Sequence, residues 1–179
     1  MPTEEYLPLA IREFERSKRL ADRAMAQLSA DHFFAQPGAG DNSVGLIVKH
    51  VGGNLLSRWT DFLSSDGEKP GRHRDTEFTI LSEDSRERLL AGWEKGWAAL
   101  FQALGPLHAS DLGRTITIRG EPLTVLQAIN RQLTHYAYHV GQIVYLAKHF
   151  AGAEWKSLSI PVGGSERFNQ APTKYVEKG

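Results

Sequence analysis

The chain of 179 residues contains no cysteine. Disulfide bonds, thiolate nucleophiles and cysteine-ligated zinc or iron–sulfur sites are therefore excluded, and any metal ion has to be held by histidine, carboxylate or amide side chains. The sequence also has no excess of either charge, with 21 Lys and Arg against 21 Asp and Glu. No basic stripe favours nucleic acid as a partner, and no apolar run approaches the roughly 20 residues of a membrane span. We therefore expect a soluble protein that binds neither nucleic acid nor a membrane.

The amino-terminal segment mixes acidic and basic residues and lacks the apolar core and cleavage site of a signal peptide, which predicts a cytoplasmic protein. Its 41% hydrophobic and 23% charged residues are ordinary for a globular chain. A chain of this length can bury a genuine core without covalent staples. We expect one domain spanning residues 1–179.

Apolar residues recur at steps of three and four in four segments, at roughly 4–30, 43–63, 82–104 and 122–150. This period predicts four long helices, the second capped by Asn42 or Ser43 and the last opened by Pro122. The segment before the last helix, "RTITIRGEPLT", alternates β-branched and polar residues around Arg119 and Gly120, which predicts a short hairpin. The expected fold class is all-α.

The connections between these segments bear on topology. Antiparallel neighbours in a bundle need only short links, whereas the 18 residues 64–81 are enough for the chain to return along a helix. We therefore predict a four-helix bundle in up-down-down-up order, although a long loop kept for a functional reason would have the same length. The tail, residues 151–179, has no helical period but contains Trp155, Leu158, Ile160 and Phe168, and we expect it to be irregular and packed on the bundle.

Two of the seven histidines, His135 and His139, are four residues apart in the last segment. A helical projection places them beside the predicted core face, which consists of Leu126, Ile129, Leu133, Ala137, Val140 and Val144. His50 holds a similar position on the second helix, beside Asn54. Two imidazoles at this spacing and one from a facing helix form an open three-ligand metal site, although such pairs also occur as solvated or hydrogen-bonded core residues.

The neighbours of these histidines limit the chemistry. Tyr136 follows His135 where a zinc protease of the HExxH type needs glutamate, so that class is excluded. No Asp or Glu lies one helical turn from the histidines on the same line, so no general base is assigned. Gly52 and Gly53 within the second helix indicate a close helix approach or room for a ligand beside His50.

Four stretches together resemble the DinB/YfiT-like superfamily of metalloenzymes, in an uncharacterised branch of unknown function: "IVKHVGGNLLSRWTDFL", "HYAYHVGQIVYLAK", "SSDGEKPGRHRDTEF" and "WKSLSIPVGGSERFN". The resemblance covers nearly the whole chain. It implies the up-down-down-up bundle and a divalent ion, most often nickel or zinc, on three histidines. The positions that match are His50, His135 and His139.

The superfamily includes thiol-dependent enzymes, so the resemblance implies a metal-dependent enzyme such as a thiol S-transferase, with a low-molecular-weight thiol as a partner. Asn54, Arg131 and Gln142 are the candidate substrate-binding neighbours, and no catalytic residue is assigned. The alternative is a noncatalytic metal-binding or small-ligand-binding helical bundle. In either case we expect a homodimer that uses exposed apolar helix surface.

Overall fold

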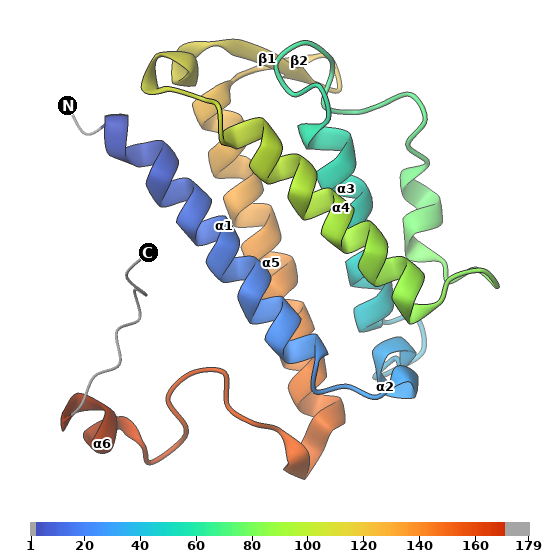
Figure 1. Cartoon of the computed structure of the whole chain (residues 1–179). Coiled ribbons are helices and arrows are strands. Elements are labelled where there is room, and N and C mark those ends of the chain that lie inside the picture. Colours follow the sequence, from blue (N-terminus) through green and yellow to red (C-terminus); the bar gives the residue numbers. More distant parts are fainter. Residues whose placement is uncertain (1–2, 171–179) are drawn as a thin grey trace.

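The computed structural model describes residues 3–170 as a mostly helical protein with one small antiparallel sheet (Figure 1). In chain order its elements are α1 (Thr3–Met25), α2 (Ala30–Phe34), α3 (Val44–Trp59), η1 (Arg74–Phe78), α4 (Arg86–Leu104), η2 (Ala109–Gly113), β1 (Thr115–Ile118), β2 (Glu121–Thr124), α5 (Val125–Ala151), η3 (Gly152–Glu154) and α6 (Ser165–Gln170).

Side-chain caps set the starts of the helices. The hydroxyl of Ser43 accepts a hydrogen bond from the Leu46 amide at the start of α3, and Ser85 does the same for α4. At α5, Thr124 and Gln127 form a reciprocal capping box. The prediction that Pro122 opens this helix was wrong, because Pro122 lies in β2 opposite Thr117. In a two-stranded sheet its missing amide is tolerated.

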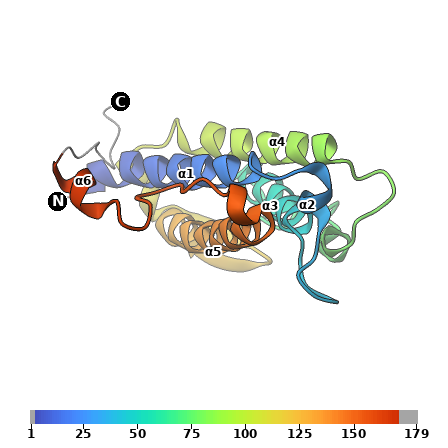
Figure 2. The ribbon, with the colours of Figure 1, turned by 90° about the horizontal axis from the view of Figure 1, so that it is seen from below.

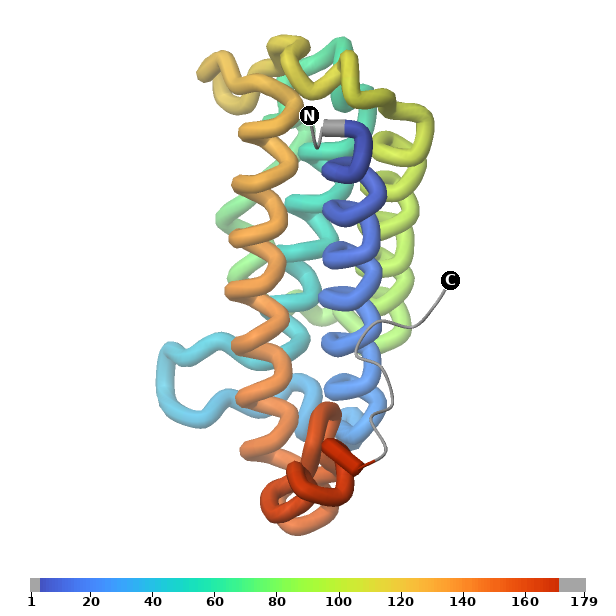
Figure 3. The backbone as a smooth tube through the Cα atoms, turned by 90° about the vertical axis from the view of Figure 1, so that its left-hand side faces the viewer, coloured from blue at the N-terminus to red at the C-terminus, as the bar shows by residue number. Residues whose placement is uncertain are grey.

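The four long helices lie along one another, with α3 against α4 and α1 against α5 (Figures 1 and 3). By the colour bar of Figure 1, α1 and α5 run downward and α3 and α4 run upward. The hairpin β1–β2 crosses the upper end of the helices, and α2 lies beside the start of α3, as the view from below also shows (Figure 2). The long segment between α3 and α4 thus spans the length of the helices and contains the short helix η1.

Small residues allow the close approach of α3 and α4. A Cβ atom at Gly52 would lie 3.3 Å from the backbone of Gly92, and one at Gly96 would lie 3.0 Å from the Gly52 carbonyl oxygen. Gly52 therefore has the packing role expected for it. Gly53, by contrast, faces the segment that follows α3.

The core of α5 differs from the predicted face. Leu126 is 37% exposed and Ala137 is exposed, whereas Gln132 and Tyr136 are buried. Tyr136 lies between the rings of Phe14 and Trp97, with ring centroids 5.9 and 5.5 Å away. Its hydroxyl accepts a hydrogen bond from the Trp59 indole and donates one to Asn54, both at 3.1 Å. These internal partners allow a polar aromatic residue to occupy the centre of the core, which hydrophobic periodicity did not predict.

The tail is more regular than expected, since it contains η3 and the short helix α6. It contacts α1 through Lys156, whose backbone amide donates to the Gln27 side chain at 2.7 Å and whose carbonyl accepts from it at 3.1 Å. Trp155 and Leu158 pack against the core. The last part of the predicted tail, residues 171–179, lies outside the described residues.

Candidate metal centre

The structure brings together the three histidines that the sequence analysis selected. His50 lies in the first half of α3, and His135 and His139 lie one turn apart in α5. The ring centroids of His135 and His139 are 4.6 Å apart, and that of His50 is 5.6 and 5.0 Å from them. Each ring offers one nitrogen atom, and these three atoms lie within 4.8 Å of one another. Among residues 3–170 this cluster could hold a metal ion.

Hydrogen bonds determine which nitrogen of two rings is free. Nδ1 of His50 lies 2.8 Å from a carboxylate oxygen of Glu77, and Nδ1 of His139 lies 2.8 Å from the amide oxygen of Gln142. Because both oxygens are acceptors, each Nδ1 carries the proton and each Nε2 keeps its lone pair. A partner on the outer nitrogen of a histidine is the usual arrangement behind a metal ligand.

The distances suit a metal ion. Nε2 of His135 and Nε2 of His139 are 3.1 Å apart. With metal–nitrogen bonds of about 2.05 Å, two ligands are about 3.3 Å apart in a tetrahedral site and about 2.9 Å apart at a right angle. The observed separation lies between these values. Nδ1 of His135 is buried and has no hydrogen-bond partner among the described residues.

Burial keeps the two histidines of α5 neutral. Desolvation, together with the charges of His139 and His50, lowers the pKa of His135 to about 3. Burial also lowers the pKa of His139, although its bond to Gln142 partly opposes the shift. Neutral imidazoles have lone pairs available for a metal ion at neutral pH, so the lowered pKa values of these two histidines agree with a role as metal ligands.

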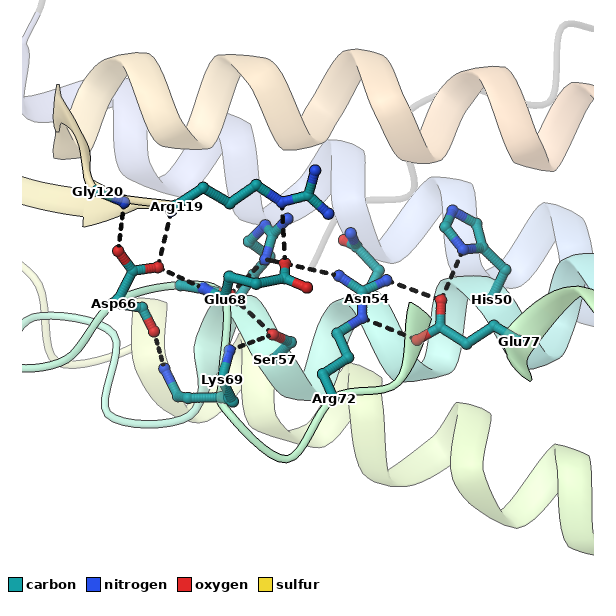
Figure 4. A network of polar contacts seen from close by, with 12 residues as sticks. His50, Asn54, Ser57, Asp66, Glu68, Lys69, Arg72, Glu77, Arg119 and Gly120 are labelled. Carbon is teal, nitrogen blue, oxygen red and sulfur yellow. Dashed lines mark hydrogen bonds and ion pairs between the residues drawn. The ribbon is translucent and has the colours of Figure 1, made fainter. Parts of the chain in front are cut away.

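Glu77 is the residue that the sequence analysis missed. It comes from η1, in the segment between α3 and α4, and is buried beside His50 (Figure 4). Arg72 donates two hydrogen bonds to its carboxylate, both at 2.8 Å. Burial by itself would raise the pKa of Glu77, but the bonds and charges of Arg72 and His50 outweigh it and the pKa is lowered. The carboxylate therefore stays ionised and orients His50.

Gly53 makes this contact possible. A Cβ atom at Gly53 would collide with the carboxylate oxygen of Glu77, so only glycine leaves room for the carboxylate against α3. Of the two alternatives that the sequence left open, room for a ligand beside His50 is not what the structure shows at Gly53. The occupant is a side chain of the same protein.

The polar network continues away from the histidines (Figure 4). Glu68 accepts hydrogen bonds from Arg58 at 2.7 Å, Arg72 at 3.2 Å and Arg119 at 3.4 Å. An open pocket of about 180 Å³ adjoins it. The pocket is lined by nine residues: His50, Asn54, Arg58, Arg72, Arg74, Arg119, Arg131, Gln132 and His135.

Of the three residues predicted to bind substrate, two line the pocket and one does not. Asn54 and Arg131 line the pocket. Gln142 instead contacts His139 and donates through its amide nitrogen to the Tyr138 hydroxyl at 3.1 Å, so it orients a histidine. The arginines of the pocket, apart from Arg131, were missed because they come from separate segments that no single helical projection can bring together.

These features define a helical protein with a three-histidine cluster that could hold a metal ion. The chain belongs to the family described as "Protein of unknown function (DUF1572)", whose model matches residues 2–164. Comparison with curated proteins and with solved structures yields no match. Among the helices within residues 3–170, none has the length and apolar character needed to span a bilayer. The expectation of an uncharacterised family is confirmed, and the placement in the DinB/YfiT-like superfamily stays a prediction.

Proposed function

We propose that this protein binds a divalent metal ion, nickel or zinc, through His50, His135 and His139. The observation that carries the proposal is the convergence of three imidazoles, two of which have the outer nitrogen engaged by Glu77 or Gln142. Three neutral nitrogen ligands favour a transition metal or zinc over magnesium or calcium, which prefer oxygen ligands.

We further propose that the four long helices form the up-down-down-up bundle of the DinB/YfiT-like superfamily. We also propose that the protein is a metal-dependent enzyme, for example a thiol S-transferase. A divalent ion in an open site supplies Lewis acidity that lowers the pKa of a bound water or thiol. The chain's own contribution is to hold three ligands on one side and to leave the other side open to the pocket, which His50 and His135 also line.

A noncatalytic metal-binding or ligand-binding role is the alternative, and one observation favours it. Both carboxylates nearest the pocket are already engaged, Glu77 by Arg72 and His50, and Glu68 by three arginines. A carboxylate held in this way is a poor general base. A metal ion held by the three histidines would supply the acidity that activates a thiol, so thiol chemistry there would not depend on Glu77 or Glu68 as a base.

Metal content tests the site. Protein purified without a histidine tag and analysed by elemental mass spectrometry should contain about one nickel or zinc ion per chain. His135→Ala should lose most of it, whereas His149→Ala, an exposed residue later on the same helix, should retain it. Equal metal content in the wild type and in His135→Ala would refute the proposal.

Catalysis needs a separate test. Low-molecular-weight thiols should be combined with electrophilic substrates, with and without a chelator. Turnover that depends on the metal and on His135 supports an enzyme. Metal binding without turnover of any thiol supports the noncatalytic alternative.

The domain and oligomer assignments belong to the same proposal. We propose that the chain forms one domain and that two chains form a homodimer. Sedimentation at two protein concentrations tests the dimer. Tyr138 and Tyr145 are 63% and 73% exposed and are seven residues apart on α5, so they supply apolar surface on one side of that helix.

A further inference from the structure

We propose that the pocket beside the histidines binds an anionic oxygen group, a carboxylate or phosphate, of a small molecule whose other end reaches the three-histidine site. The anion pocket stands on its own contacts. The statement about the other end of the molecule rests on the proposed function.

The charge of the pocket is the first argument. Five arginines from four separate segments line it: Arg58, Arg72, Arg74, Arg119 and Arg131. Three carboxylates form ion pairs with the guanidinium groups of these arginines, namely Glu68, Glu77 and Asp75, and Asp75 is fully exposed and 3.8 Å from Arg74. Five guanidinium groups against three carboxylates leave an excess of two positive charges before any metal ion is bound. Guanidinium groups bind carboxylate and phosphate through paired hydrogen bonds.

Unused hydrogen-bonding capacity is the second argument. Nε of Arg58 is a buried donor without a partner within residues 3–170, and Arg58 lines the pocket. The side chain of Arg58 is only 7% exposed. Arg131 has no carboxylate partner among the described residues. A buried donor without a partner is costly, and an anion in the pocket would supply acceptors.

The backbone of Arg119 is the third argument. Arg119 and Gly120 form the turn between β1 and β2, and both have positive φ, 58° and 74°. That conformation favours asparagine or glycine and is unfavourable for arginine. Asp66 holds the turn by accepting hydrogen bonds from the amides of Arg119 at 2.8 Å and Gly120 at 2.7 Å (Figure 4). An arginine kept in a strained position over a pocket indicates a role for its side chain.

The spacing of the residues limits the ligand. Arg131 precedes His135 by four residues on α5, which is about 6 Å along the helix axis, and Arg58 follows His50 by eight residues on α3, which is about 12 Å. Along the chain, Asn54 lies between His50 and Arg58 and Gln132 lies between Arg131 and His135, and both line the pocket. The anionic group and the group at the histidines should therefore be separated by one to two helical turns.

Titration calorimetry of the metal-free chain tests the anion pocket. Inorganic phosphate and malonate should bind at low ionic strength, and Arg131→Gln and Arg119→Asn should each weaken binding at least tenfold. Arg16→Gln, an exposed arginine of α1 outside the pocket, is the matched control and should bind as the wild type does. Arg119→Asn should also raise the melting temperature, because asparagine suits the turn, so weaker binding cannot come from misfolding. Unchanged binding in both variants, or no binding by the wild type, overturns the proposal.

A second measurement tests the link to the histidines. The zinc-loaded chain is titrated with 6-mercaptohexanoate and 6-mercaptohexanol, which share a thiol and a chain length and differ in charge. The acid should bind at least tenfold more tightly, and Arg131→Gln should remove the difference. Equal affinities overturn the link. If the chain binds no metal but still binds phosphate through Arg131, the proposed function fails and the anion pocket stands.

Discussion

Replacing Glu77 by glutamine tests whether the segment between α3 and α4 completes the metal site. The substitution preserves shape and removes charge. In the wild type, the carboxylate accepts from His50 and twice from Arg72, all at 2.8 Å, and its side chain is 9% exposed. The amide can accept from only one side and presents N–H groups to a donor on the other.

The expected effects follow from these contacts. Breaking a buried ion pair typically costs about 3–5 kcal/mol. Arg72 keeps a second partner, Glu68 at 3.2 Å, so we expect a loss of about 2–3 kcal/mol in the free energy of unfolding. Loss of a partner behind a metal-binding histidine typically lowers metal affinity 10- to 100-fold, or about 1.4–2.7 kcal/mol.

Two assays separate these effects. Urea denaturation of the metal-free chain measures the loss of stability, and competition with a chromophoric zinc chelator measures affinity under conditions where both proteins are folded. Glu13→Gln, an exposed glutamate on α1, is the control and should change neither. If Glu77→Gln binds zinc as tightly as the wild type, the view that Glu77 orients His50 is wrong.

Three further substitutions probe neighbouring features. Gly53→Ala should displace the carboxylate that faces it and weaken zinc binding several-fold, whereas Gly92→Ala, where a Cβ atom meets nothing within 4 Å, should bind normally; chelator competition compares them, and equal affinities would contradict the steric argument. Asp66, whose pKa is lowered from 3.8 to about 2 by backbone hydrogen bonds, stabilises the fold above pH 4 and loses this contribution as the pH falls toward 2. Asp66→Asn should therefore cost about 1–2 kcal/mol at pH 7, with the deficit shrinking in acid, and a deficit independent of pH in denaturation curves would count against it. Tyr136→Phe should lower the free energy of unfolding by about 1–3 kcal/mol, because the Trp59 indole loses its acceptor; a variant as stable as the wild type in urea would show that the hydroxyl is dispensable.

Local patterns predicted the elements well. Ser43 caps α3 as expected, and the hairpin turns at Arg119 and Gly120. The predicted helix starts were less accurate where a strand or a capping box, and not a proline, sets the first residue of the helix. α5 begins at Val125 because Thr124 and Gln127 satisfy its first amides, three residues after the proline that suggested an earlier start.

The core face of α5 shows why periodicity has limits. The predicted face contained only apolar side chains, and it did not include Gln132 or Tyr136, which the structure buries. Burial depends on whether a polar atom finds a partner, and the partners of Tyr136 come from α3. These partners are distant in the chain and are invisible to a projection of one helix. The predicted face was therefore rotated away from Tyr136, and Ala137, which was predicted to face the core, is exposed.

The sequence by itself determined the helical class, the absence of cysteine ligands and the selection of His50, His135 and His139, because helical spacing and residue chemistry are local properties. Only the tertiary structure decided that Glu77 lies behind His50 and that five arginines meet in one pocket. Glu77, Arg72, Arg74 and Arg119 lie outside the four long helices, in segments without a helical period. The positions of all these residues depend on contacts between segments far apart in the chain. The histidines alone do not indicate a ligand. The glutamate and the arginines that the fold places beside them indicate how one histidine is oriented and that the neighbouring pocket is positively charged.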